Sequence, residues 1–451
     1  MSVSDVDKLL GMEVYATTTS GVGGRIKASV DDFVVEEVLV DGSKASVGGS
    51  VPSRAIGSTV QKQRFLLCLM VKRNWDTFIA TENVAKSLGI DQSRVQFAGI
   101  KDTKAVTAQY ITIENVTDED AAKVDVKDVQ VKPVGYIREM LSLFYLLGNN
   151  FTITIKNTAT PETAVTERIE ETMLEIGAVG GLPNFYGHQR FGTIRPITHL
   201  VGKALVQGRF EEAAMLFLAK PSPYEHSASR QARQNLQDSH DFKAAFENFP
   251  KQLRFERLML RHLAENPTDY VGAFHRLPMK LQALFVQAHQ SYLFNRFLSE
   301  RIKQGLPMNR AVAGDFVVGV ERSGLPLTTV SKAVTTETLD AVNAQIKTGK
   351  LRVALPIVGA KAKLSGGEMG QIEREILQIE GVGSEEGWLN ELSRIGGKGG
   401  LRTAAAPIRD FKIQHVAENT VQISFMLLRG CYATVLLREI MKPQDLVAAG
   451  F

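Results

Sequence analysis

Short apolar runs separated by turn residues dominate the first 160 residues of the chain. Three of them are rich in β-branched and aromatic residues, which is typical of strands: 33–40, 64–72 and 109–114. Between the second and third runs, apolar residues recur at helical spacing. This helix should begin at Asp76 or Thr77, either of which can cap it, and end at Gly89.

A turn at residues 148–150 leads into a further predicted strand, in which apolar and polar residues alternate from 151 to 156. The next helix is expected to be capped by Thr160, with Pro161 in its first turn. Strands and helices therefore mix locally, and the pattern predicts a protein of the α+β class.

The period of the pattern changes after about residue 180. Residues 197–303 are mainly helical, 311–377 are β-like, and 378–400 form a Gly-rich, charged loop. A strand at 420–428 and a helix from 433 to about 442 close the chain. These last elements could complete the unit with which the chain begins, around a large insertion.

The composition is that of a globular protein, with 44% hydrophobic and 23% charged residues among 451. A net charge of +4 permits nucleic acid as a partner without requiring it. Two cysteines form no disulfide framework, and the eight histidines lack metal-binding spacing, so no metal site is expected. The pattern of the first residues predicts no signal peptide, no apolar run reaches membrane-spanning length, and we expect a soluble, cytoplasmic protein.

The segment FAGIKDTKAVTAQ, residues 97–109, holds the candidate chemistry. Asp102 lies between Lys101 and Lys104 on a Gly-containing loop between two strand-like runs. A carboxylate with ammonium groups nearby suits a catalytic acid that meets a phosphate-bearing substrate. On spacing alone, however, a solvated surface turn is the more common interpretation of such charges.

Four further segments, read with this one, carry a resemblance. In chain order the five are IKASVDDFVVEEV (26–38), AGIKDTKAVTAQ (98–109), GNNF (148–151), NFYGHQRFG (184–192) and RGCYATVLLREIM (429–441). Together they resemble the TruD family of tRNA pseudouridine synthases, in which matching segments occur in the same order. HQSYLFNRFLSERI, residues 289–302, is similar to a helix of the domain inserted in that family.

The resemblance implies a fold and a division of the chain. The expected catalytic core is a mixed, mostly antiparallel sheet with flanking helices, formed by residues 1–183 and 403–451. An α/β TRUD insertion domain would span 184–402. The implied activity is isomerisation of uridine to pseudouridine in tRNA, characteristically at uridine 13 of the D-arm. The reaction needs no cofactor; the sequence leaves the oligomeric state open, with a monomer favoured.

The resemblance also implies site residues. Asp102 would attack the sugar at C1′ or remove its 2′-proton, with Lys27 as its ionic partner and Asn149 as a hydrogen-bonding residue. Phe151 would stack on the target uracil, and Phe33 and Glu37 would belong to the same pocket. Without the resemblance, core packing is the more common role for the two phenylalanines, and a turn is the default context for Asn149.

Several cations are candidate RNA contacts. Lys101 and Lys104 should point away from Asp102 and toward phosphate, because neighbours on an extended segment face different sides. Arg190 lies at the junction of the two domains, and Arg402 where the chain re-enters the core, in a group that also holds Arg394, Lys398 and Arg409. A second group, Lys251, Arg254, Arg257 and Arg261, is more typical of a solvated helix face.

Two other functions compete with this interpretation. An RNA-binding or RNA-chaperone protein could keep the fold without turnover, although the retained Asp102, Lys27, Asn149 and Phe151 argue against a decayed site. A hydrolase that uses Asp102 is disfavoured, because no second carboxylate is positioned by motif to activate water.

Overall fold

A nine-stranded, mostly antiparallel sheet runs through the computed structural model, which describes residues 2–382 and 395–451. Its main strand order is β14-β15-β7-β2-β5-β3-β6, while β1 pairs with β7 and β4 with β5. The strands are β1 (Gly23–Arg25), β2 (Phe33–Leu39), β3 (Phe65–Arg73), β4 (Val95–Phe97), β5 (Val106–Glu114), β6 (Val129–Ile137), β7 (Leu146–Thr158), β14 (Ile408–Ala417) and β15 (Thr420–Leu428).

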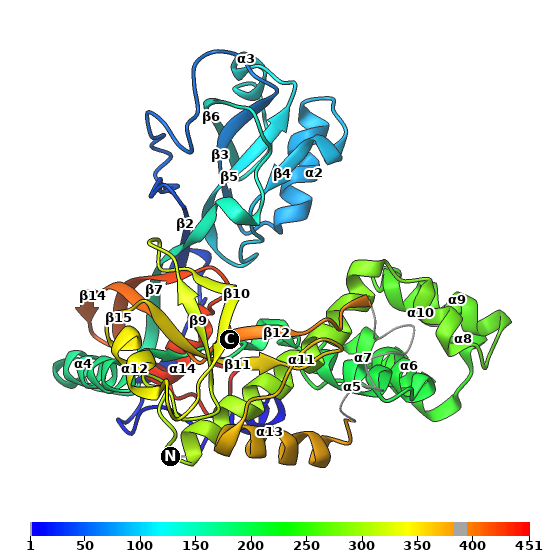
Figure 1. Cartoon of the computed structure of the whole chain (residues 1–451). Helices are drawn as coiled ribbons and strands as arrows, with labels where there is room; N and C mark the ends of the chain where they lie inside the picture. Colours follow the sequence, from blue (N-terminus) through cyan, green and yellow to red (C-terminus); the bar gives the residue numbers. More distant parts are fainter. Residues whose placement is uncertain (1, 383–394) are drawn as a thin grey trace.

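The last strands of the chain lie in the sheet that the first strands begin. Strand β15 pairs antiparallel with β7 over nine residue pairs, from Thr420 opposite Lys156 to Leu428 opposite Gly148. Strands β2 and β5 form a parallel pair, and β5 continues into the part of the sheet drawn at the top of Figure 1. The sheet therefore brings three of the five sequence segments onto neighbouring strands and the loops before them, and a fourth, 429–441, directly follows β15.

The helices of this part follow their local signals, with one correction. Helix α2 (Thr77–Ser87) is capped by the carboxylate of Asp76, which accepts from the amides of Phe78 and Ile79. Helix α4 (Glu162–Ala178) has Pro161 at its N-cap, so the prediction that Thr160 caps it is wrong. The short α3 (Asp118–Ala121) precedes β6, and α14 (Ala433–Met441) follows β15.

Residues between β8 (Leu182–Pro183) and β13 (Ala405–Ala406) form a set of helices and a smaller sheet, which lie in the lower half of Figure 1. The helices are α5 (Thr198–Val206), α6 (Phe210–Ala219), α7 (Ser227–Ser239), α8 (Phe242–Asn248), α9 (Arg254–Glu265), α10 (Tyr270–His275), α11 (Met279–Lys303), α12 (Leu339–Lys347) and α13 (Gly367–Glu380). The sheet has the order β10 (Pro326–Ala333), β9 (Phe316–Val320), β11 (Leu351–Ile357), β12 (Gly400–Thr403). The β-like prediction for 311–377 thus missed α12 and α13.

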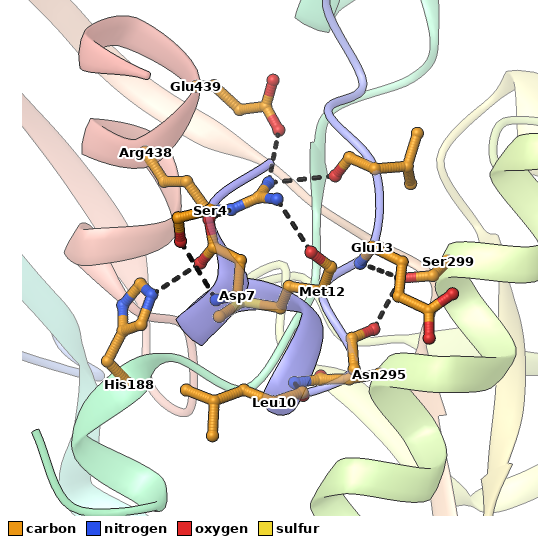
Figure 2. Close-up of polar contacts among 12 residues, drawn as sticks. Ser4, Asp7, Leu10, Met12, Glu13, His188, Asn295, Ser299, Arg438 and Glu439 are labelled. Carbon is orange, nitrogen blue, oxygen red and sulfur yellow. Dashed lines mark hydrogen bonds and ion pairs between the residues drawn. The ribbon is translucent and has the colours of Figure 1, made fainter. Parts of the chain in front are cut away.

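The N-terminal helix α1 (Asp5–Leu9) joins distant parts of the chain through a buried polar network (Figure 2). The carboxylate of Asp7 lies 3.0 Å from Nε of Arg438 on α14 and 2.8 Å from Nε2 of His188. Burial acts to raise the pKa of Asp7, but the charges and hydrogen bonds of Arg438 and His188 outweigh it and hold that pKa below its ordinary value. Helix α11 joins the network, since Asn295 donates to the carbonyl of Leu10.

In the described part of the chain, no helix combines the length and the apolar character needed to cross a membrane.

Candidate active site

Asp102 lies on the loop between β4 and β5, with its side chain 25% exposed. Its Oδ1 atom is 2.9 Å from Nζ of Lys27, which reaches it from the loop that follows β1. On another side, Nε2 of Gln189 approaches the same oxygen at 3.5 Å. The structure thus brings Asp102 together with Lys27, 75 residues away in sequence, as the resemblance implied.

The backbone at Lys27 has a positive φ of 52°, which is uncommon for a residue with a side chain. This conformation directs the ammonium group toward the sheet, where Nζ lies 4.3 Å from the ring centroid of Phe33. The ammonium group is therefore held between a carboxylate and an aromatic ring.

Four side chains hold the loop of Asp102 from beneath, each from a different element. The Gly99 carbonyl accepts from Nε2 of Gln109 on β5 (3.1 Å), and the Asp102 carbonyl accepts from Nζ of Lys72 on β3 (2.9 Å). Thr77 of α2 accepts from the Lys101 amide and donates to the Lys101 carbonyl. The fourth is Glu37, on β2, which binds the ammonium of Lys101. The backbone on both sides of Asp102 is thereby fixed by the fold.

The prediction that Lys101 faces phosphate is wrong. Its Nζ lies 2.6 Å from Oε1 of Glu37, and the two side chains are only 2% and 0% exposed. Oε2 of Glu37 also accepts from the amide of Tyr110, so both carboxylate oxygens are used. Glu37 accordingly lies beneath the loop of Asp102 and does not line an open pocket. Lys104, in contrast, is exposed and has no ion pair among the described residues.

Lys72 is a site residue that the sequence analysis missed. It is fully buried and donates to the carbonyls of Asp102 (2.9 Å) and Trp75 (2.7 Å). Burial lowers its pKa to about 8, with the charges of Asp102 and Asp76 opposing that shift and Lys101 adding to it. The available signal was its place at the end of the apolar run 65–71, where a lysine inside a strand needs a partner.

One face of the sheet beside the loop carries the predicted substrate-binding rings. The rings of Phe33 and Phe151 meet edge to face, with 6.2 Å between their centroids. Phe151 also stacks on Phe425 of β15, with 5.3 Å between the centroids. Both predicted rings are largely buried, with Phe33 1% and Phe151 6% exposed. Both rings contribute to the core, and the exposed fraction of Phe151 is the larger of the two.

Polar atoms without partners lie near these rings. Asn149 is two residues before Phe151 on β7, and its pairing partner on β2 is Glu37. Among the described hydrogen bonds, none joins Asn149 to Asp102, and its buried Oδ1 atom has no partner. Thr107 Oγ1 and Gln109 Oε1, on β5, are also buried without partners. Orphaned polar atoms of this kind are unusual in a core and need a further partner, such as water or a ligand.

Three successive residues of the turn η4 (His188–Arg190) face three different surroundings. His188 points into the network of Asp7, Gln189 approaches Asp102, and Arg190 binds helix α11. Arg190 donates from Nε to Ser291 (3.1 Å) and from an Nη to Oε1 of Gln287 (3.2 Å). The buried histidine thus anchors a turn that links the loop of Asp102 to the insertion.

Arg402 is engaged within the fold. Its guanidinium donates to the carbonyls of Asn184 and Gly430, and lies 4.1 Å above the ring of Tyr186. Arg409 donates to the carbonyl of Ser323. Arg394, grouped with these cations in the sequence analysis, falls outside the described residues.

Among the residues that the structure describes, no group of three or more His, Cys, Asp or Glu side chains is arranged to hold a metal ion.

This architecture matches a solved structure over nearly its whole length. A crystal structure of a protein from Methanosarcina mazei, assigned as tRNA pseudouridine synthase D (TruD), superposes with a TM-score of 0.82 at 36% identity. The match covers 98% of this chain and 99% of that one. The mixed, mostly antiparallel sheet is therefore the pseudouridine synthase fold, and the chain is of that class of RNA-modifying enzymes.

Sequence comparison gives the family. A family model described as tRNA pseudouridine synthase D (TruD) matches residues 9–440. A relative from Methanosarcina acetivorans, described as probable tRNA pseudouridine synthase D, is 38% identical over 99% of both chains. One from Pyrococcus abyssi with the same description is 39% identical over 95% of this chain and 98% of its own. The chain belongs to the TruD family, whose members are isomerases that form pseudouridine in tRNA.

Proposed function

We propose that Asp102 is the carboxylate that acts on the target nucleotide, and that this nucleotide is uridine 13 in the D-arm of tRNA. The observation that carries the assignment of Asp102 is its ion pair with Lys27, at 2.9 Å, on a loop held by four side chains from beneath. Membership of the TruD family supports the choice of position 13.

The reaction requires the N1–C1′ bond to break, the uracil to turn, and C5 to bond to C1′. The proton leaves C5 and N1 gains one, so no redox step occurs and no outside group enters. An ionised carboxylate at C1′ either attacks that carbon or removes the 2′-proton, and both routes use the same residue. The side chain of Asp102 is exposed enough to reach a nucleotide, and its ion pair with Lys27 orients the carboxylate.

The surrounding residues have distinct proposed roles. Lys27 orients the carboxylate of Asp102, and the small exposed part of Phe151 supports the uracil while it turns, with Phe33 behind it. Asn149 offers its unpaired Oδ1 as an acceptor to the sugar once substrate is bound. Lys104, exposed beside the loop, is a proposed phosphate contact.

We also propose the division of the chain into a catalytic core, 1–183 with 403–451, and an insertion domain, 184–402. Pairing of β15 with β7 supports the first, and the separate sheet of β9 to β12 supports the second.

The test is pseudouridine mapping of tRNA after incubation with the wild type and with Asp102→Asn. We expect pseudouridine at position 13 with the wild type and no product with the variant, while both bind tRNA. Equal product from both proteins would reject Asp102. Product at another position would reject uridine 13, and absence of product from the wild type would favour an RNA-binding protein without turnover.

A further inference from the structure

A cavity of about 440 Å³ lies beside the turn η4, within the insertion. Its walls come from Tyr186 and Arg190, from Gln287, Gln290 and Ser291 of α11, and from the glycine-rich segment 395–399. This volume is in the range of small-ligand sites and can hold one nucleotide.

A second, smaller cavity of about 150 Å³ adjoins the first, since Tyr186 and Ile357 line both. It extends to the end of β15 and the turn that follows, where Arg429 and Cys431 form part of its wall. The two cavities are therefore neighbours, with Tyr186 and Ile357 in the wall of each, the first beside α11 and the second beside the end of β15.

The charge of this surface is one-sided. The described residues that line the two cavities include no carboxylate, whereas several of them are cations. These cations are Arg190, Arg352, Lys398, Arg402 and Arg429.

The four arginines among these cations have neutral hydrogen-bond partners. Arg352, Arg402 and Arg429 donate to backbone carbonyls, and Arg190 donates to a hydroxyl and an amide oxygen. The positive charge along the cavities is therefore held in place without being neutralised, as in sites that bind anions. Elsewhere, buried arginines have carboxylate partners: Arg301 with Asp315, Arg233 with Glu225 and Glu256, and Arg438 with Asp7.

The first cavity is also close to the reacting carboxylate. Gln189 approaches Asp102 at 3.5 Å, and the next residue, Arg190, lines the cavity. Adjacent residues of one turn therefore contact Asp102 and line the cavity, so we place a neighbour of the target uridine, and not the uridine itself, at this cavity.

We propose that the cavity beside Arg190 binds a nucleotide that flanks the target uridine, with its phosphodiester between Arg190 and Lys398. The base lies against Tyr186 and the amides of α11, where Gln287 and Gln290 offer polar groups. This site is defined relative to the target uridine at Asp102, so it rests on the proposed function in that respect.

The test uses the full chain and tRNA transcripts that each carry one abasic nucleotide near the modified uridine. We expect one flanking abasic position to weaken binding by the wild type roughly five- to a hundredfold, as loss of a stacked base does. The same position should cost Lys398→Ala and Arg190→Ala much less, because their site is already impaired. Each variant should also reduce the slope of log affinity against log salt by about 1.

Lys243→Ala is the matched control, since this lysine is exposed on α8 and has no ion pair among the described residues. It should behave as the wild type. Lys398 is exposed, so its replacement does not disturb packing. Lys398→Ala therefore still tests the site if Arg190→Ala fails to fold.

The proposal is overturned if Lys398→Ala matches the control in affinity and salt slope, or if every abasic position weakens binding of the wild type and the variants equally. Turnover by Asp102→Asn would instead reject the proposed function and leave these binding results standing.

Discussion

The loop of Asp102 and the junction around Arg190 use positive charge in opposite ways. At the loop, Lys27 pairs with Asp102 and Lys101 pairs with Glu37. Around the junction, the cations that line the two cavities have no carboxylate beside them among the described lining residues. Paired charges fix the geometry of a carboxylate, whereas unpaired charges remain available to a polyanion.

The difference separates two kinds of contribution to one reaction. Residues at the loop should influence the rate of the chemical step, because they position Asp102, the carboxylate that we propose reacts. Residues at the junction should influence affinity and its salt dependence, because phosphate contacts position the RNA without taking part in the chemistry. Variants in the two regions should therefore change different measurable quantities.

The largest effect should follow from breaking the buried pair beneath the loop. Lys101→Met leaves the carboxylate of Glu37 buried without its ionic partner, and we expect a loss of about 3–5 kcal/mol in the free energy of unfolding. Urea denaturation measures it. The double variant Lys101→Met with Glu37→Gln should recover most of the loss; equal stability of wild type and single variant would show that this pair does not hold the loop.

Replacement of the aromatic face should reduce turnover by a smaller amount. Phe151→Leu keeps an apolar side chain in the core but removes the ring, and the activation free energy of the single-turnover reaction should rise by about 1–3 kcal/mol. Affinity for tRNA should change little. Phe425→Leu is the control, since Phe425 stacks on Phe151 and is 2% exposed. An equal rate loss in both variants would point to packing as the only role of Phe151.

The smallest effect should appear as a pH dependence of the loop's anchor. Burial lowers the pKa of Lys72 to about 8, so its ammonium is present at pH 7 and is lost as the pH rises past 8. A neutral amine binds the Asp102 carbonyl more weakly, by about 1 kcal/mol, or roughly fivefold in rate. The single-turnover rate should therefore decline above pH 8 in the wild type relative to Lys72→Arg, which stays charged. Parallel pH profiles would exclude Lys72 as the cause.

Much of the fold follows from local patterns in the sequence. The runs 33–40, 64–72 and 420–428 correspond to β2, β3 and β15 because β-branched, apolar strands need only to be buried on a sheet. The β-like prediction for 311–377 failed at α12 and α13, where short amphipathic helices lie between strands. Their packing depends on tertiary contacts that a local period does not specify.

Site residues that belong to a sequence motif could be predicted, whereas residues whose role depends on burial in the folded sheet could not. Asp102 and Lys27 were expected together through the resemblance, and they form an ion pair. Lys101 was expected at the surface because sequence spacing carries no information on Glu37, which lies 64 residues away on β2. Lys72 was missed for the same reason, since its role comes from the pairing of β3 with β5 beneath the loop.

The most direct test of the central claim is the single-turnover rate of Lys27→Met at saturating tRNA, compared with that of Lys398→Ala. We predict that Lys27→Met lowers this rate by at least about a hundredfold, since the reacting carboxylate loses its orienting partner, while tRNA affinity stays near the wild-type value. Lys398→Ala should keep the saturated rate and lose affinity. A Lys27→Met protein with the wild-type rate and weakened tRNA binding would contradict the separation of chemistry from binding.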